Sequence, residues 1–302
     1  MSYNLITILG PTAVGKTKLG VRLADIFNCE IISADSRQVY KGMDIGTGKD
    51  LSCYQINKKQ IKYHLIDVIE PKDEFNLFEF VKQFNLIFPK IKESNKTPLM
   101  VGGTGLYLSS ILQKYKLRKA DFSEKIIAKL ETQSTERLVE NLKNLNPKLH
   151  NTTDLLDRDR IIKAIVVERS KEFDNEINTY VKSFNIGIKE KRETIKERIN
   201  LRLKHRLNNG MIDEVKNLMN SGISYERLKL LGLEYKFIAM YLNGELNYND
   251  MYQKLDSSIN NFAKRQMTWF RKMEKEGCVI NWIDGADFDE AKKLISRNYF
   301  NE

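Results

Sequence analysis

Short apolar runs alternate with helix-length amphipathic segments along the N-terminal third of the chain. The runs expected to form strands are residues 5–9, 30–33, 64–69 and 98–101. The segments expected to form helices are residues 16–27, 77–93 and 106–113, because their apolar residues recur at helical spacing. Strands separated by helix-length segments indicate β-α-β units, so the pattern predicts an α/β fold with a parallel sheet flanked by helices.

Helical patterns dominate the rest of the chain, and we expect the strands to stop after about residue 114. Residues 118–175 are expected to form a small all-helical insertion, and residues 1–117 and 176–302 the main domain with a helical C-terminal part. Further helices are expected at 189–208, 211–219, 233–242 and 251–275. Gly210 can end the first of these because glycine accepts the left-handed cap conformation.

Composition adds constraints but no function. The chain has 302 residues, of which 41% are hydrophobic and 30% charged, as is ordinary for a globular protein. No apolar run approaches the roughly 18–20 residues needed to span a bilayer, and the N-terminus reads as a strand rather than a leader. The scattered cysteines and histidines indicate neither a disulfide framework nor a metal cluster, and they fit a reducing cytoplasm: Cys29, Cys53, Cys278, His64, His150 and His205.

The clearest motif is a phosphate-binding loop of the form GxxxxGK[ST]. It comprises Gly10, Pro11, Thr12, Ala13, Val14, Gly15, Lys16 and Thr17. It follows an expected strand and precedes an expected helix, which is the context that lets backbone N–H groups and the helix N-terminus attract phosphate oxygens. Lys16 adds positive charge, and the Thr17 hydroxyl can ligate Mg²⁺. The sequence therefore predicts a P-loop NTPase-like fold that binds a diphosphate or a nucleotide.

An acidic residue follows the second expected strand. Asp35 would lie at the carboxyl end of a parallel strand beside the phosphate loop, where it can face a substrate. Its carboxylate could act in catalysis, bind a water on Mg²⁺ or cap the following turn, and position alone does not choose between these roles. The strand at 98–101 runs into Gly102 and Gly103 and lacks the acidic residue usual in motor-type NTPases.

The net charge is +10, and its distribution along the chain is more informative about binding partners than its total. In the helix expected at 189–208, Arg198, Arg202 and Arg206 form a stripe beside an apolar face, and the arginine fork suits phosphate groups. The segment 262–272 mixes aromatic with cationic residues. That mixture fits RNA contact, although Trp269 and Phe270 could equally belong to the core.

Together these segments resemble the tRNA dimethylallyltransferases, or tRNA isopentenyltransferases, along nearly the whole chain. The stretches that carry the resemblance are 10–17, 32–47 (ISADSRQVYKGMDIGT), 101–107 (VGGTGLY), 157–164 (DRDRIIKA), 198–202 (RINLR) and 263–269 (AKRQMTW). One stretch and two single positions depart from the family pattern. Residues 165–171 (IVVERSK) stand where the family usually has a Thr-Gly pair. Lys163 stands where arginine is usual, and Leu233 where many members have tyrosine.

The resemblance implies transfer of a dimethylallyl group from its diphosphate to N6 of the adenosine just 3′ of the anticodon, position 37. It implies that Asp35 is the general base, that residues 10–17 hold the diphosphate with Mg²⁺ near Thr17, and that Arg198 binds the diphosphate. The residues that match tRNA-contacting segments are Asp35, Ser36, Arg37, Gln38, Thr104, Asp159, Arg160, Ile161, Ile162, Lys163, Lys264, Arg265, Gln266 and Arg271. The insertion at 118–175 would grip the anticodon stem-loop of tRNA, and the enzyme would act as a cytoplasmic monomer.

Three other classes of protein use some of the same parts. A small-molecule kinase has such a loop and a nearby aspartate, but the basic C-terminal half argues against it. An adenylate prenyltransferase acting on free nucleotide would lack much of the insertion and the Lys264–Gln266 segment. A non-catalytic RNA-binding protein would not need intact Lys16, Thr17 and Asp35.

Overall fold

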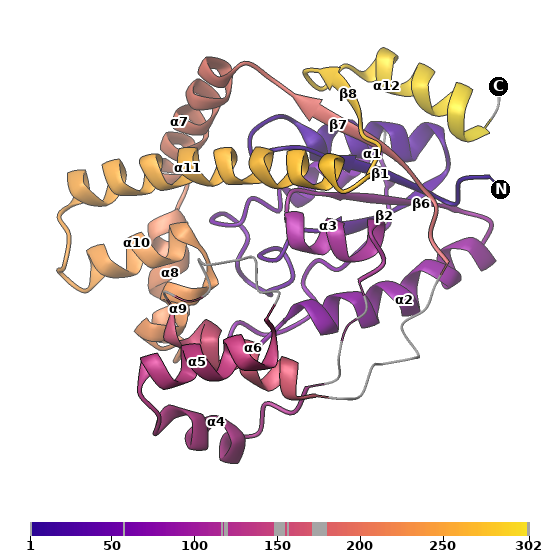
Figure 1. Ribbon diagram of the computed structural model, residues 1–302. Helices are drawn as coiled ribbons and strands as arrows, with labels where there is room; N and C mark the ends of the chain where they lie inside the picture. The colour runs from indigo at the N-terminus through magenta and orange to yellow at the C-terminus, as the bar shows by residue number, and fades with distance from the viewer. Residues whose placement is uncertain are drawn as a thin grey trace. The chain divides into compact units, whose positions relative to one another are not determined.

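The fold is a parallel sheet with helices on both faces. The computed structural model describes residues 2–56, 58–115, 117, 120–147, 155, 157–170 and 180–300. Within these residues, six strands pair in parallel in the order β5-β2-β6-β1-β7-β8 (Figure 1). They are β1 (Leu5–Leu9), β2 (Cys29–Ala34), β5 (Tyr63–His64), β6 (Thr97–Gly102), β7 (Ser183–Lys189) and β8 (Asn281–Asp284). The predicted parallel α/β fold is confirmed.

The strand assignments differ from prediction in two places. The expectation that strands stop after about residue 114 is wrong, because β7 pairs with β1 and β8 completes the sheet. The run expected at 64–69 is a strand only over Tyr63–His64, since Leu65 and Asp67 have φ angles of 62° and 55° that bend the chain out of the sheet. A separate antiparallel hairpin is formed by β3 (Gln55–Ile56) and β4 (Lys59–Gln60).

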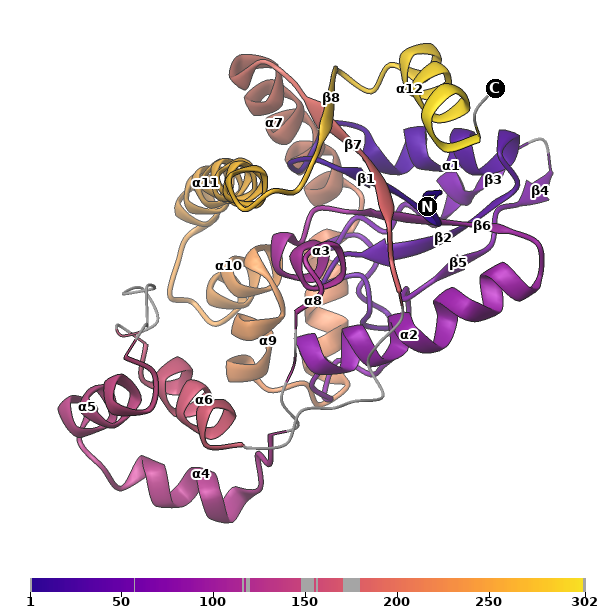
Figure 2. The same cartoon turned by 45° about the vertical axis from the view of Figure 1, so that its right-hand side comes forward.

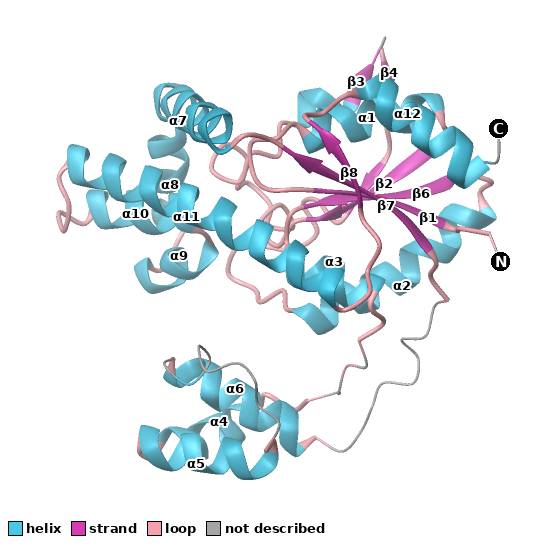
Figure 3. Ribbon diagram, turned by 45° about the horizontal axis from the view of Figure 1, so that its top comes forward, coloured by secondary structure: helices cyan, strands magenta, loops and turns pink. Residues whose placement is uncertain are grey.

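Different helices cover the two faces of the sheet (Figure 3). Helices α1 (Lys16–Ile26) and α12 (Phe288–Ile295) lie on one face, where Leu19, Leu23 and Ile295 join the strand residues in one buried cluster. Helices α2 (Leu77–Glu93) and α3 (Gly105–Leu112) lie on the other, where the rings of Phe80 and Tyr107 stack with centroids 4.0 Å apart. Because both faces are covered, the strands are apolar on both sides.

A layer of helices follows β7. It consists of α7 (Arg192–Asn208), α8 (Met211–Asn220), α9 (Tyr225–Leu231), α10 (Leu233–Leu242) and the long α11 (Tyr248–Lys275). Helix α11 contacts both α7 and α3, and α10 contacts α8, α9 and α11. This layer therefore joins the basic helix α7 to the sheet domain.

The chain divides into two compact units, one formed by Met1–Lys114 with Thr179–Glu302 and the other by Tyr115–Asn178. The second unit contains α4 (Glu124–Glu131), α5 (Thr135–Leu145) and α6 (Arg158–Arg169), which pack around a small core of leucine and isoleucine side chains (Figure 2). The Arg158 guanidinium donates to the carbonyls of Glu131 (2.8 Å) and Gln133 (2.5 Å), and so ties α6 to the α4–α5 turn. The predicted boundary residues 118 and 175 lie outside the described residues.

Candidate active site

The phosphate loop connects β1 to α1 and provides the strand–loop–helix arrangement that its motif requires. Gly15 has a φ angle of 91°, a left-handed conformation that turns the chain directly into the helix at Lys16. Helix α1 therefore begins inside the motif, with its unpaired N–H groups and the positive end of its dipole available to an anion.

Lys16 is the cation of this loop. Its Nζ donates to the Pro11 carbonyl over 2.6 Å. Removal from water lowers the pKa of Lys16 to about 8, with the negative charge of Asp35 opposing the shift and the positive charge of Arg202 adding to it. These three charged side chains are therefore close enough to influence one another.

Asp35 follows the last residue of β2 and begins a tight turn. Its Oδ1 accepts the N–H of Arg37 over 2.9 Å, while among the described residues Oδ2 makes no hydrogen bond. The next residue, Ser36, donates its N–H to Thr104 Oγ1 (3.0 Å), and the Thr104 N–H reaches back to the Ala34 carbonyl (3.1 Å). One carboxylate oxygen thus caps the turn, and the other is left for a substrate.

Arg202, rather than Arg198, contacts the phosphate loop. Its Nη2 donates to Thr12 Oγ1 over 2.6 Å, and burial together with the nearby Arg206 charge lowers its pKa to about 10. The side chain of Arg198 is 45% exposed and pairs with Glu190 at the end of β7 over 3.1 Å. The family resemblance indicates Arg198 and overlooks Arg202, which lies one helical turn away in the same stripe.

Gln266 has a structural role instead of the predicted RNA contact. Its buried Oε1 accepts the Thr12 N–H and its Nε2 donates to the Gly103 carbonyl, each over 2.8 Å. A Cβ on Gly103 would stand 2.5 Å from Gln266 Nε2, so only glycine allows this approach. The amide therefore joins α11 to the phosphate loop and to the turn after β6, and the prediction for Gln266 is corrected.

Two other predicted RNA contacts are held by the protein itself. The Gln38 side chain is buried between Ser33, whose Oγ donates to its Oε1 over 3.1 Å, and the Gly48 carbonyl, which its Nε2 reaches over 3.3 Å. The Arg37 guanidinium donates to the Leu230 carbonyl at the end of α9 over 2.7 Å. Gln38 is thus a core residue, whereas Arg37 keeps an exposed guanidinium edge.

The cationic residues of α11 lie on its exposed side, whereas Trp269 and Phe270 of the same segment face inward. Lys264, Arg265 and Arg271 are exposed. Phe270 is fully buried, and Trp269 donates its Nε1–H to Ser109 Oγ over 2.7 Å. Phe270 therefore belongs to the core, whereas Trp269 is only partly buried.

The residues of α6 that were predicted to contact tRNA also divide into exposed and buried side chains. Asp159, Arg160 and Lys163 have exposed side chains on the surface of the helical unit. Ile161 and Ile162 are 0% and 3% exposed and belong to its core, so their side chains cannot meet RNA at this surface, and the prediction for them is corrected. The surface of α6 is therefore charged and its inner side apolar.

All three cysteines are free. Over the described residues, no group of histidine, cysteine or acidic side chains is arranged to hold a metal ion, and no helix has the length and apolar character needed to cross a membrane. The hydroxyl of Thr17 at the phosphate loop makes no hydrogen bond among the residues described.

Comparison with known proteins identifies the family. The family model described as IPP transferase matches residues 38–273, more than half of the chain, and the model described as isopentenyl transferase matches residues 3–64. A tRNA dimethylallyltransferase 1 of Geotalea uraniireducens is 50% identical over 301 residues, covering 99% of each chain. A tRNA dimethylallyltransferase 1 of Syntrophus aciditrophicus is 45% identical over 302 residues, again covering 99% of each chain.

The solved structures agree with these relatives. The crystal structure of the tRNA isopentenylpyrophosphate transferase from Bacillus halodurans is 31% identical, with a TM-score of 0.69 and coverage of 99% of this chain and 95% of that one. A eukaryotic dimethylallyltransferase acting on tRNA shares the fold with a TM-score of 0.75 at 22% identity, covering 99% of this chain and 77% of that one. The chain therefore belongs to the IPP transferase family.

Proposed function

We propose that this protein transfers a dimethylallyl group from dimethylallyl diphosphate to N6 of adenosine 37 in tRNA, releasing diphosphate. The observation that carries the proposal is the electrostatic cluster at the carboxyl edge of the sheet. There Lys16 and Arg202 lie at the phosphate loop, and one oxygen of the Asp35 carboxylate makes no hydrogen bond to any described residue. The relatives from Geotalea and Syntrophus carry the name of a tRNA dimethylallyltransferase, which supports the same reaction.

The phosphate loop would hold a leaving group in this reaction. As the allylic C–O bond breaks, its electron pair passes to the diphosphate, which gathers negative charge. The loop N–H groups, Lys16 and Arg202 are positioned to stabilise that charge, and a single such donor is typically worth on the order of 10²–10³ in rate. Arg198, paired with Glu190, could swing toward the same diphosphate because it is partly exposed.

Asp35 would act as the general base. An adenine amino group is a poor nucleophile because its lone pair is delocalised into the ring. When the new C–N bond forms at N6, Oδ2 of Asp35 takes the N6 proton, so the product amine leaves neutral. Proton transfer of this kind contributes about 10²–10⁴-fold.

Mg²⁺ fits the donors present if the substrate supplies most of them. Magnesium keeps several waters and binds through substrate phosphates with few protein ligands, and the Thr17 hydroxyl on the first turn of α1 is available for this role. A bound Mg²⁺ would supply further positive charge for the leaving diphosphate.

The exposed charges supply surfaces for tRNA. We assign the phosphate backbone to Lys264, Arg265 and Arg271 on α11, and the anticodon stem-loop to the helical insertion, where Arg160 and Lys163 are exposed. The target base must leave its stack to reach Asp35, which costs a few kcal/mol that pocket contacts offset. Cytoplasmic location and a monomeric state belong to the same proposal.

The experiment that tests the proposal compares acceptors. Labelled dimethylallyl diphosphate and Mg²⁺ are incubated with the protein and either unmodified tRNA or free AMP, and ATP hydrolysis is measured in parallel. We expect label in tRNA only. Label in AMP would identify an adenylate prenyltransferase, ATP turnover with a small-molecule acceptor a kinase, and tRNA binding without any transfer a non-catalytic RNA-binding protein.

A further inference from the structure

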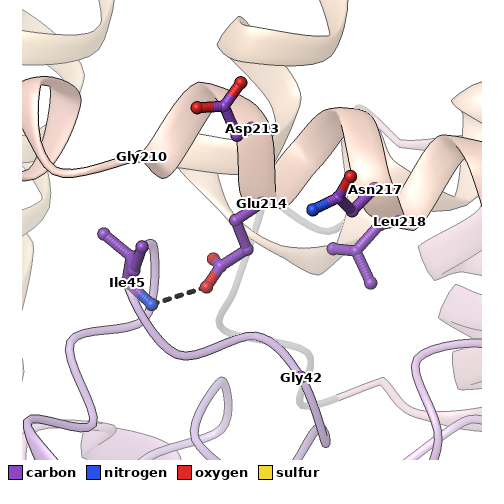
Figure 4. A pocket seen from close by; sticks show the side chains of 7 residues that line it. All are labelled: Gly42, Ile45, Gly210, Asp213, Glu214, Asn217 and Leu218. Atoms are coloured by element: carbon purple, nitrogen blue, oxygen red, sulfur yellow. Dashed lines mark hydrogen bonds between the residues drawn. The ribbon is translucent and has the colours of Figure 1, made fainter.

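A carboxylate outside the proposed reaction centre holds the loop that follows Asp35. Glu214 points from α8 toward residues 44–46, and its bond to the Ile45 N–H is drawn in Figure 4. Oε2 accepts the N–H groups of Asp44 (2.8 Å) and Ile45 (2.7 Å), and Oε1 accepts the Gly46 N–H (3.0 Å). Oε1 also accepts the hydroxyl of buried Tyr235 over 2.6 Å.

The same loop is connected to both halves of the reaction centre. On one side, the Gly48 carbonyl accepts from the Gln38 amide, whose oxygen also accepts from Ser33 on β2, the strand that Asp35 follows. On the other side, the Gly46 carbonyl accepts from buried Arg206 over 3.5 Å, and Arg206 lies one helical turn from Arg202. A displacement of residues 44–48 would therefore shift both Asp35 and Arg202.

The rest of the loop is also fixed from within. The ammonium of Lys49 is fully buried, and it donates to the Tyr40 carbonyl (2.7 Å), to Asp44 Oδ1 (2.6 Å) and to Asp67 Oδ1 (2.5 Å). Charge-assisted bonds of this kind are stronger than neutral ones, and a network whose members are all paired is rigid. Glu214 completes this network from the α8 side, because it accepts the N–H groups of Asp44, Ile45 and Gly46.

We propose that Glu214 is a positioning residue for the transfer reaction. It acts through the backbone of residues 44–46, and it keeps Asp35 and Arg202 at the distances that the chemistry requires. This inference rests on the proposed function. Misplacing reacting groups by about 1 Å can cost on the order of 10²-fold in rate, so loss of the anchor should lower kcat more than it changes substrate binding.

The test compares Glu214→Gln with Asp213→Asn. Both variants exchange one carboxylate for an amide on the same turn of α8, and both residues line the same open depression of about 340 Å³. In Glu214→Gln, an NH₂ group replaces one acceptor and faces backbone N–H groups. We expect its kcat with saturating substrates to fall on the order of 10-fold or more, which is a larger factor than the change in its affinity for inorganic diphosphate. Asp213→Asn should keep the wild-type kcat.

A second readout does not depend on activity. Hydrogen exchange of the peptide covering residues 43–48 should be faster in Glu214→Gln than in Asp213→Asn. Equal exchange and equal kcat in the two variants would overturn the proposal, as would a lower melting temperature with an unchanged kcat. If exchange responds but the wild type transfers no prenyl group, the anchor stands and the proposed function fails.

Discussion

At the scale of single residues, the reaction centre depends on charges that modify one another. Lys16 loses part of its proton affinity because the protein shields it from water and because Arg202 lies near, and Asp35 restores some of it. An incoming diphosphate would add negative charge to the same place. The ionic state of Lys16 should therefore depend on whether the donor is bound, and this coupling can be measured.

Diphosphate affinity should depend on pH through Lys16. The pKa of Lys16 is lowered to about 8 from 10.5. The amine is therefore protonated and positively charged below about pH 8, and neutral above it. We expect the affinity of the free protein for inorganic diphosphate, measured by calorimetry, to fall as pH rises through about 8. In Lys16→Arg the cation persists, so this fall should be absent. An identical pH profile in both proteins would contradict the assignment.

Arg202 should matter more than Arg198 for holding the donor. Arg202→Ala removes the bond to Thr12 and a cation at the loop, whereas Arg198→Ala removes an exposed pair with Glu190. Hydrogen bonds to charged groups are worth about 1.5–3 kcal/mol, so Kd for diphosphate should rise by about 10-fold or more in Arg202→Ala. The comparison would go against the structure if Arg198→Ala had the larger effect.

Asp35→Asn should separate catalysis from binding. The amide keeps the size of the side chain, but it cannot take the N6 proton. We expect kcat to fall by about 10²–10⁴-fold with tRNA affinity retained. Single-turnover transfer and filter binding would check the two quantities, and a kcat close to that of the wild type would remove Asp35 as the base.

At the scale of elements, long helix α11 is fixed to the sheet domain through Gln266. Its amide satisfies the Thr12 N–H and the Gly103 carbonyl at once, and the bond to the Gly103 carbonyl is buried. A buried polar group left without its partner costs about 1–3 kcal/mol, so a change here should be felt in stability.

Gln266→Leu should therefore reduce the free energy of unfolding by about 1–3 kcal/mol or more, since two backbone groups lose their partner. Arg265→Ala, on the neighbouring exposed position, is the matched control and should stay near the wild-type value. Urea denaturation followed by circular dichroism measures both. Similar denaturation midpoints for the two variants would show that the two hydrogen bonds of Gln266 contribute little to stability.

Element patterns in the sequence predict this fold unequally. Continuous apolar runs identify β1, β2 and β6, because both faces of those strands are covered. In β7, buried Asn185 and Gly187 interrupt the run. Gly187 is there because a Cβ would stand 2.5 Å from the ring of Trp282 in β8. Such pairings between distant segments are invisible in a local pattern, which explains the missed strands.

At the scale of the whole molecule, a motif locates the site better than it assigns each side chain. The phosphate loop and Asp35 are local signals, and each lies at the end of its strand as expected. Whether Gln38, Ile161 or Gln266 faces solvent depends on packing between elements. The family resemblance predicted that these residues contact RNA, but their side chains are buried. Arg202 belongs to the arginine stripe predicted from the sequence, but helical spacing alone does not say which of the three arginines contacts the phosphate loop.

The charge on α11 should act on tRNA as a whole. Neutralising Lys264 and Arg265 to alanine removes two exposed cations without touching the buried side of the helix. We expect weaker tRNA binding and a shallower dependence of affinity on salt, by nearly one unit of slope for each phosphate that is no longer neutralised. Titrations at several salt concentrations measure both quantities. An unchanged salt dependence of tRNA affinity would show that Lys264 and Arg265 do not contact tRNA.

The central claim is transfer to a single base of tRNA. We would measure incorporation of labelled dimethylallyl diphosphate, with Mg²⁺, into an unmodified tRNA bearing adenosine 37 and into the same tRNA bearing guanosine there. The structure and the family predict label in the first tRNA only, recovered as N6-dimethylallyladenosine. Equal labelling of both tRNAs, or of neither by folded protein that binds them, would contradict the claim.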